Sequence, residues 1–429
     1  MNKPMLFWAS CLALLVTSLS FGIRAGIMED LMMQFQLSGT QMGLITGTAF
    51  WGFPLAIIVG GMIVDIVGMK RLMVLAFVLH LMGIVLTIFS TGFTSLFIST
   101  LFIGIANGTV EAVGNPLVAT IYPDQKTTKL NHFHLWFPAG IVIGTLISFV
   151  FGGLGWGWQW QMAAMIPPTL IYGWMIWKLD FPVTERVSSG ISTREMYKSI
   201  LSPLVIFMFI CMLGTAVTEL FTNQWVGVLL QNVTDNAILV LALVVTVQTI
   251  CRAFAEPVFR NTTPSGLLLV SAIISTVGLY LLSTMTGNSI FIAAIVFGIG
   301  VAYFWPTMLG FVSENIPESG AVGINLLGGA GSLAVSFFMF LMGGYYDKLI
   351  GSALPQGAIL EVYRSAEEGT LEAMTYLDAQ LSAGPQVIRA TIIIPVLLTV
   401  AFLFLYLYMR RKKGCGAEGL AGVPLKPSV

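Results

Sequence analysis

Charged side chains are scarce in this chain of 429 residues, because Asp, Glu, Lys and Arg make up only 9% of it. A soluble domain averages roughly 25%. So few charges cannot solvate the surface of a protein this large, and hydrophobic residues reach 56%. The composition excludes a water-soluble enzyme, a nucleic-acid-binding protein and a disordered chain. The formal net charge is zero, so the total charge indicates no charged partner.

Cysteine and histidine are also scarce. The four cysteines have neither CxxC nor metal-ligand spacing, and three of them lie in apolar runs, as small buried hydrophobic residues do. No cluster of His, Cys and Asp resembles a transition-metal site, and the sequence contains no Walker-type phosphate loop. The sequence therefore predicts no metal site, no cofactor and no ATP-driven chemistry.

Long apolar runs fill the chain instead. A membrane helix needs about 20 mainly apolar residues, and twelve segments meet this condition. The predicted spans are 5–28, 40–63, 70–91, 93–121, 131–154, 160–178, 200–231, 236–259, 265–285, 288–312, 320–344 and 386–409. The first run resembles a signal peptide but has no convincing small-residue cleavage site, so we interpret it as an uncleaved helix.

Polar segments divide the spans into two sets of six. We predict an N-terminal bundle over 1–178, a linker over 179–199, a C-terminal bundle over 200–409 and a tail over 410–429. An acidic outer loop over 345–386 is expected to carry a surface helix that acts as a lid or packing element, or else binds a partner. The predicted fold is an all-α integral membrane protein with twelve transmembrane helices in two pseudo-symmetric six-helix bundles.

Lysine and arginine are distributed unevenly between the two ends of these spans. With the N-terminus inside, only Lys348, Arg364 and Arg389 fall outside, while Arg24 and Arg252 fall within spans and all the others lie inside. Cytoplasmic loops carry such a basic surplus. The sequence therefore predicts a bacterial-type inner membrane protein with both termini in the cytoplasm.

Two spacings recur in equivalent pairs of spans. Asp65 to Gly83 and Arg260 to Gly278 both cover 18 positions, and Gly104 to Pro123 and Gly298 to Pro317 both cover 19. This repetition indicates a duplicated six-helix unit. Duplicated bundles place their substrate site between the halves, near the middle of the membrane.

The loop between the second and third spans reads Gly61-Met-Ile-Val-Asp65-Ile-Val-Gly68-Met-Lys70-Arg71. It resembles the G-x-x-x-D-x-x-G-x-[RK]-[RK] signature of the major facilitator superfamily, and the six-plus-six division extends the resemblance over nearly the whole chain. The resemblance implies alternating access by two bundles around a central cavity. It also implies that Asp65, Lys70 and Arg71 act at the cytoplasmic gate, where Asp65 beside a helix N-terminus can latch adjacent helices.

Two groups within that superfamily share further features with the chain. Glu111-Ala-Val-Gly-Asn115-Pro116 and Tyr303-Phe-Trp305-Pro306 look similar to the fucose–proton symporter group of sugar transporters. Arg24 in the first span, with Glu111-Ala-x-x-x-Pro, resembles the organic anion–cation symporters instead. Those use a first-helix arginine for substrate carboxylates and a fourth-helix glutamate for protons, so the charge of the substrate stays open.

Five ionisable residues lie within the predicted spans, where each costs about 2.5–3.5 kcal/mol on insertion scales. They are Arg24, Glu111, Glu219, Arg252 and Glu256. Polar neighbours follow at helical spacing, and such stripes must face the bundle interior or a wet cavity because lipid cannot satisfy them. Arg252 and Glu256 are one turn apart, so we expect them to neutralise each other and to act in gating.

Arg24 and Glu111 have no opposite charge within their own spans. The family fold brings spans one and four together, so we expect the two side chains to pair across the cavity. Desolvation favours the protonated form of a carboxyl group, and Glu111 is expected to release Arg24 to the substrate when it binds a proton. Glu219 has no obvious charged partner and is the second candidate for proton coupling.

Amide and indole side chains supply further candidate substrate contacts. Amides offer donors and acceptors to hydroxyl-rich solutes, and an indole suits the apolar face of a sugar ring. The predicted substrate-binding residues are Arg24, Asn115, Asn223, Gln224, Trp225, Trp305 and Asn325. His132 and His134 are interpreted as structural or gating residues, and Gly22-x-x-x-Gly26 indicates close helix packing.

The sequence thus predicts a proton-coupled symporter that imports a small polar organic solute, with a sugar or sugar derivative as first candidate. A carboxylated solute bound by Arg24 is the alternative, and sodium is the alternative coupling ion. A non-transporting receptor or a membrane-embedded enzyme is the rival class, which the lack of a sizeable soluble domain and of a catalytic constellation opposes. The expected partners are a small-molecule substrate and the lipid bilayer, with no nucleic acid, and we expect a monomer.

Overall fold

The hydrocarbon core of a membrane offers the backbone no hydrogen-bond partners, so apolar runs of this length form helices that satisfy their own N–H and C=O groups. The structure, a computed structural model, describes residues 2–420 except 38, 224, 226–236 and 368. It is 87% helical, and no strand occurs among these residues. The predicted all-α fold is confirmed.

The helices follow one another in chain order. The first half contains α1 (Lys3–Phe35), α2 (Gly39–Val67), α3 (Met69–Ile88), α4 (Phe93–Ile121), η1 (Pro123–Gln125), α5 (Lys126–His134), α6 (Trp136–Gly153), α7 (Trp158–Ala163) and α8 (Ile166–Lys178). Two short helices, α9 (Glu185–Ser188) and α10 (Thr193–Ile200), follow in the linker. The second half contains α11 (Pro203–Ala216), the π-helical turn η2 (Val217–Phe221), α13 (Ala237–Ala253), α14 (Ala255–Asn261), α15 (Pro264–Leu282), η3 (Gly287–Ser289), α16 (Ile290–Val301), α17 (Phe304–Asn315), η4 (Pro317–Ser319), α18 (Gly320–Ala353), α19 (Leu360–Arg364), α20 (Leu371–Thr391) and α21 (Ile393–Leu420).

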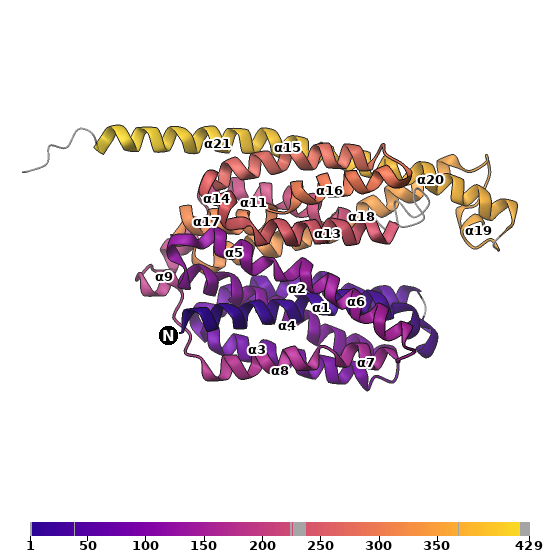
Figure 1. Cartoon of the computed structure of the whole chain (residues 1–429), viewed down its shortest axis with the longest axis horizontal. Helices are drawn as coiled ribbons and strands as arrows, with labels where there is room; N and C mark the ends of the chain where they lie inside the picture. Colours follow the sequence, from indigo (N-terminus) through magenta and orange to yellow (C-terminus); the bar gives the residue numbers. More distant parts are fainter. Residues whose placement is uncertain (1, 38, 224, 226–236, 368, 421–429) are drawn as a thin grey trace, which may run out of the picture.

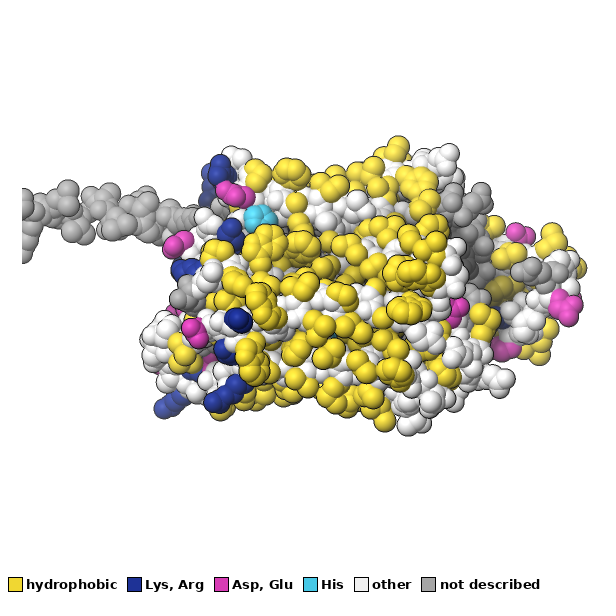
Figure 2. Space-filling model, turned by 60° about the horizontal axis from the view of Figure 1, so that its bottom comes forward, with side chains coloured by type: hydrophobic (Ala, Val, Ile, Leu, Met, Phe, Trp, Pro, Cys, Tyr) yellow, Lys and Arg dark blue, Asp and Glu magenta, His cyan; other side chains and the backbone are white. Residues whose placement is uncertain are grey.

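The two halves lie side by side with their helices along the long axis (Figure 1). The N-terminus, α9 and the far end of α21 lie at one end, which we call the basic end, and α19 and α20 project from the other (Figure 1). Figure 2 shows hydrophobic side chains over the middle of one face and Lys and Arg side chains gathered at the basic end. This distribution suits a protein whose middle contacts lipid.

Most predicted spans correspond to long helices. Ten helical segments of the described residues are long and apolar enough to cross a membrane, and α13 with α14 forms an eleventh that is bent by 61°. Helices α7 and α8 together occupy the predicted sixth span, but a break at Ala164 and Met165 leaves each of them short. Much of the predicted outer loop 345–386 is helical, in the end of α18, in α19 and in α20.

The repeated spacings occupy equivalent places in the two halves. A Cβ on Gly83 in α3 would lie 2.9 Å from the Ser99 carbonyl oxygen of α4, and a Cβ on Gly278 in α15 would lie 2.5 Å from the Phe297 Cα of α16. Pro123 and Pro317 each begin a short 3₁₀ turn, η1 and η4. Both halves therefore use the same glycine contact and the same turn, as a duplicated unit would.

Helices α1 and α6 pack closely through the predicted glycine motif. A Cβ on Gly22 would lie 2.4 Å from the Ile141 carbonyl oxygen, and one on Gly26 would lie 2.4 Å from Ser148 Cβ. Since real Cβ atoms essentially never approach so closely, only glycine fits at both positions. This contact fixes α1, which carries Arg24, against α6.

Candidate functional site

Glu111 of α4 lies at the centre of a buried polar cluster. Its Oε2 accepts a hydrogen bond of 2.8 Å from Asn115 Nδ2 and lies 3.9 Å from His134 Nε2. Asn115 Oδ1 and His134 Nε2 are 2.8 Å apart. An amide oxygen only accepts, so His134 donates from Nε2, and a chain of hydrogen bonds runs from His134 through Asn115 to the carboxylate. Glu111 and Asn115 are one turn apart on α4, which allows their side chains to bond, and α5 supplies the histidine.

Arg252 of α13 lies against Glu219 of η2. Its Nη2 donates to Glu219 Oε1 at 2.7 Å, its Nε donates to the Ala302 carbonyl at 2.6 Å, and its Nη1 donates to the His134 carbonyl at 3.0 Å. Arg252 is 2% exposed and Glu219 is 3% exposed. The last of these bonds crosses between the halves, so the ion pair of the C-terminal half is tied to the helix that carries His134.

The expected pair of Arg252 and Glu256 does not form. Helix α13 ends at Ala253 and α14 is bent by 61° from it, so one-turn spacing no longer brings the two side chains together. Glu256 pairs instead with Arg260 at 2.7 Å, with side chains 52% and 74% exposed. Glu219, for which the sequence indicated no charged partner, is the partner of Arg252.

Arg24 and Glu111 do not pair in this structure. The Arg24 guanidinium lies over the Phe21 ring, 5.3 Å from its centroid, and no described residue gives it a hydrogen bond or an ion pair. Glu111 is directed instead toward Asn115 and His134. Arg24 is therefore a cation in the first span without a protein anion among the described residues.

The predicted substrate-binding residues occupy different environments. Asn325 is 1% exposed, and its Nδ2 donates to the Ala112 carbonyl of the other half at 2.8 Å. Trp305 is 7% exposed and packs inside the bundle. Its ring lies against Gly328 of α18. Trp225 stacks on Phe221, with centroids 5.6 Å apart. Gln224 lies outside the described residues.

Four buried amide or carboxylate atoms of the C-terminal half have no hydrogen-bond partner among the described residues. They are Glu219 Oε2, Asn223 Oδ1, Gln248 Nε2 and Asn325 Oδ1. The first two are about one turn apart, and Gln248 lies one turn from Arg252 on α13. Native proteins leave few such groups without a partner, so these atoms are candidates for contact with a polar ligand. Helical spacing alone puts Gln248 on the same face of α13 as Arg252, but nothing in the sequence marks it as a ligand contact.

A second buried network was not foreseen from the sequence. His80 of α3 is fully buried, with Nδ1 2.8 Å from the Tyr172 hydroxyl and Nε2 2.8 Å from Asn107 Oδ1. Asn107 Nδ2 donates in turn to Ser20 Oγ at 3.1 Å. The network joins α3, α8, α4 and α1, and ends one turn from Glu111 and one turn from Arg24 on their helices. A lone histidine in an apolar run gives no sign of such partners, which lie far away in the sequence.

The signature aspartate is held by the linker. Asp65 Oδ2 accepts from Arg186 Nε at 2.6 Å, and its Oδ1 accepts from the Thr184 hydroxyl. Among the described residues neither base of the signature pairs with Asp65, because Lys70 donates to the Trp177 carbonyl and Arg71 is exposed. The latch at Asp65 therefore joins α2 to the linker.

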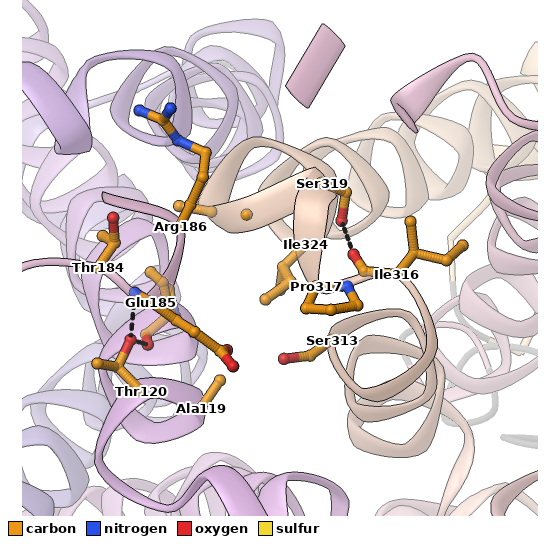
Figure 3. A pocket seen from close by; sticks show the side chains of 13 residues that line it. Ala119, Thr120, Thr184, Glu185, Arg186, Ser313, Ile316, Pro317, Ser319 and Ile324 are labelled. Atoms are coloured by element: carbon orange, nitrogen blue, oxygen red, sulfur yellow. Dashed lines mark hydrogen bonds between the residues drawn. The ribbon is translucent and has the colours of Figure 1, made fainter. Parts of the chain in front are cut away.

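The linker also lies between the halves at the basic end. Lys126 Nζ pairs with Glu185 at 2.7 Å and donates to the Ser313 carbonyl of α17, while the Thr127 hydroxyl donates to Glu314. Figure 3 shows Thr184, Glu185 and Arg186 on one side of a small cavity and Ser313, Ile316 and Pro317 on the other. The cavity of about 20 Å³ has room for roughly one water molecule. These contacts close the basic end of the interface.

Comparison with known proteins identifies the family. Residues 10–345 match the Major Facilitator Superfamily. The chain belongs to this superfamily. The described helices and the family together show a multi-pass integral membrane protein with the all-α major facilitator fold, for which a count of twelve helices is consistent, and the family points to a transporter rather than an enzyme.

Two curated relatives match parts of the chain. A D-xylose transporter of Levilactobacillus brevis is 27% identical over 154 residues, which is 35% of this chain and 34% of the relative. A 3-(3-hydroxy-phenyl)propionate transporter of Escherichia coli strain K12 is 23% identical over 213 residues, which is 49% of this chain and 52% of the relative. The chain thus spans a third to a half of the length of these relatives.

Solved structures match over nearly the whole chain. The fucose–proton symporter of E. coli has a TM-score of 0.68 at 13% identity, covering 93% of this chain and 99% of that chain. A proton–xylose symporter bound to 6-bromo-6-deoxy-D-glucose has a TM-score of 0.68 at 15% identity, covering 94% of this chain and 95% of that chain. At these identities the likeness shows the major facilitator fold.

The polar groups of this superfamily member suit reversible binding more than chemistry. Among the described residues, no group of three or more His, Cys, Asp and Glu side chains could hold a metal ion. The described polar groups include a carboxylate held by one amide, a buried ion pair with an unpaired oxygen, and an arginine without a described partner anion. Each of these can exchange its partner as a solute enters or leaves.

Proposed function

We propose that this transporter imports a small hydroxylated organic solute together with protons, with a sugar or sugar derivative as first candidate. The observation that carries the proposal is the buried Glu111 carboxylate, which has one amide partner and forms no ion pair with an arginine or lysine among the described residues. A carboxyl group so placed can take up a proton without breaking an ion pair. A buried carboxylate already paired with arginine, such as Glu219, is a weaker candidate for this role.

The proposed coupling uses the short path from Glu111 to the other half. Protonation of Glu111 removes the acceptor charge for Asn115, and Asn115 is the neighbour of His134. The His134 carbonyl receives Arg252, and Arg252 holds Glu219. A proton on Glu111 therefore acts, through Asn115, on His134, whose carbonyl accepts a hydrogen bond that joins the halves. Alternating access must open the molecule at this contact between the halves.

The proposed solute contacts are the unsatisfied polar atoms of the C-terminal half. Glu219 Oε2 and Asn223 Oδ1 accept hydrogen bonds and Gln248 Nε2 donates them. Hydroxyl groups both donate and accept, so a sugar can satisfy this set. The indole rings of Trp225 and Trp305 are the proposed surfaces for the apolar face of the ring.

An organic anion is the second candidate, and one observation favours it. The Arg24 guanidinium has no hydrogen bond or ion pair from any described residue, and an arginine in a membrane span calls for an anion. A sugar acid or another small carboxylate would supply one. The two curated relatives are described as transporters of a sugar and of an aryl-propionate, so each candidate has one of them in support.

The proposed setting is a bacterial-type inner membrane with the basic end in the cytoplasm. The basic surplus there supports this orientation (Figure 2). The structure then has its cytoplasmic end closed by the linker contacts. We propose that the protein is a monomer whose partners are its solute and the lipid bilayer. The proposed coupling ion is H⁺, and Na⁺ is the alternative.

Uptake into proteoliposomes tests this function. Labelled sugars, sugar acids and aromatic carboxylates are offered with an inward proton gradient, with an inward sodium gradient and with neither. Accumulation of one solute class only with the proton gradient is the expected result. Accumulation only with the sodium gradient would show that Na⁺ is the coupling ion instead of H⁺. Binding of a solute without uptake would favour the receptor alternative.

Arg24→Ala separates the two solute classes. If the solute is an anion, sugar acids are expected to stabilise the variant no longer, because the Arg24 guanidinium is the only proposed partner of the solute carboxylate. If the solute is a neutral sugar, stabilisation by sugars persists. A shift in melting temperature measured across both ligand sets decides between them, with Arg260→Ala on the exposed surface as the matched control.

A further inference from the structure

Three prolines near the interface leave a backbone carbonyl without a helical partner: Pro116 lies inside α4, whereas Pro138 and Pro306 lie in the first turns of α6 and α17, just after α5 and α16 end. Proline has no N–H, so the carbonyl four residues earlier loses its helical partner. Pro116 in α4 has this effect on Ala112, Pro138 in α6 on His134, and Pro306 in α17 on Ala302. The ladder resumes at the next residue in two of them, where Ala139 N–H donates to the Leu135 carbonyl and Thr307 N–H to the Tyr303 carbonyl.

All three of these carbonyls accept a buried side-chain donor. The Ala112 carbonyl accepts from Asn325 Nδ2 at 2.8 Å. The His134 carbonyl accepts from Arg252 Nη1 at 3.0 Å, and the Ala302 carbonyl accepts from Arg252 Nε at 2.6 Å. Asn325 and Arg252 are 1% and 2% exposed. A buried donor without an acceptor is costly, and three donor groups on these two side chains meet the three freed carbonyls.

Two of the three hydrogen bonds join the halves. Asn325 of α18 reaches α4, and Arg252 of α13 reaches the end of α5, whereas the bond to Ala302 stays within the C-terminal half. Each cross-half donor lies near a group of the proposed site. Arg252 also holds the Glu219 carboxylate, and Ala112 follows Glu111 directly in the chain.

We infer that Pro116 and Pro138 are positioning residues for transport, because they supply the backbone acceptors through which Asn325 and Arg252 hold the halves together. The inference rests on the proposed transport by alternating access between the halves. In the state seen here both bonds are made. When the basic end opens, Asn325 and Arg252 must leave these carbonyls, so the two prolines set how stable the closed state is.

Replacement of these prolines by alanine tests the inference, since alanine supplies the missing N–H. The new N–H competes for the carbonyl and weakens the cross-half bond without removing any side chain of the site. The reporter is Ala119→Cys, which lines the cavity of Figure 3, in a chain whose four cysteines are replaced by serine. Its rate of maleimide labelling from the basic end, in membrane vesicles that expose this end, reports how often the end is open.

Pro116→Ala and Pro138→Ala are each expected to raise the labelling rate roughly two- to tenfold, the population shift expected from weakening one hydrogen bond. Pro395→Ala in α21 is the matched control, since no described side chain donates to the Thr391 carbonyl, its partner four residues earlier. An unchanged rate in both test variants, or an equal rise in the control, would overturn the inference and leave these prolines with a role in helix bending only.

A variant of the donor covers the case in which a proline variant folds poorly, and a double-mutant cycle joins the two where both variants fold. Asn325→Ala removes the donor in place of the acceptor and is expected to raise labelling as Pro116→Ala does. The double variant is expected to rise no further than either single variant, because both act on one bond. Additive effects would contradict the inference. Labelling requires no solute, so a failure of the proposed substrate or ion would leave this result readable.

Discussion

The Glu111 carboxylate has a single amide donor and lies 3.9 Å from a histidine nitrogen. Glutamine at this position keeps the size and the polar character of the side chain but cannot bind a proton. Glu111→Gln is therefore expected to lose solute accumulation driven by a proton gradient and to keep solute exchange at equal pH. Both are measured on the same proteoliposomes with labelled solute inside and outside.

Glu256 supplies the control for this substitution. It lies on the surface, 52% exposed and paired with Arg260, so Glu256→Gln is expected to leave proton-driven accumulation unchanged. Accumulation that persists in Glu111→Gln would exclude Glu111 as the coupling residue.

At the scale of residues, helical spacing predicts which side chains share a face but not what they meet. The spacing of Glu111 and Asn115 anticipated a polar stripe, and the two side chains do bond each other. Their partner His134 and the network around His80 lie on other helices, and no local pattern encodes those contacts. Which acid pairs with Arg252 is decided by tertiary packing for the same reason.

At the scale of elements, the contact of α1 with α6 depends on glycine. A Cβ on Gly22 would lie 2.4 Å from a backbone oxygen, which cannot move as a flexible side chain does. Gly22→Ala is expected to destabilise the fold by about 1–3 kcal/mol, the usual range for overpacking. The measurement is the melting temperature in detergent, with ligand absent.

Gly152→Ala in the partner helix α6 is the control, because a Cβ there would meet nothing within 4 Å. It is expected to leave the melting temperature unchanged or raised, since alanine favours the helix. Equal melting temperatures for the two variants would show that the predicted clash is relieved elsewhere.

Helix breaks explain where the sequence predictions of elements went wrong. The apolar run 236–259 predicts one straight span, yet Phe254 and the following Pro257 separate α13 from a bent α14, and Glu256 leaves the interior. The π-helical turn η2 carries Glu219 on a wider turn than the expected α-helix. Hydropathy records how apolar a segment is and says little about where it bends.

At the scale of the whole molecule, the linker contacts hold the basic end closed. Arg186 and Asp65 form a pair whose side chains are only 9% and 6% exposed. Breaking one partner of a buried pair costs about 3–5 kcal/mol. Arg186→Gln is therefore expected to raise labelling of the Ala119→Cys reporter more than tenfold, whereas the exchange Asp65→Arg with Arg186→Asp restores part of the closure.

The exposed pair Glu256 and Arg260 is the control at the same end, and Arg260→Gln is expected to leave the labelling rate unchanged. If Arg186→Gln also left it unchanged, the linker would be a passive connection between the halves.

The architecture of the whole molecule was the most predictable part. Twelve apolar runs, a polar linker and repeated spacings around Gly83 and Gly278 suffice for a duplicated membrane bundle, because lipid leaves the backbone few alternatives. The contacts between the halves were not predictable. The linker residues Thr184 and Arg186 carry no pattern that assigns them to Asp65.

The most direct test of the account is proton movement on addition of solute. Proteoliposomes containing a pH-sensitive dye receive a transported sugar or sugar acid outside, with no imposed gradient of pH or sodium. Coupled import predicts that the interior becomes more acidic as the solute enters, and that Glu111→Gln removes the acidification while solute exchange continues. Solute entry with no change of internal pH in the unmodified protein would contradict proton coupling.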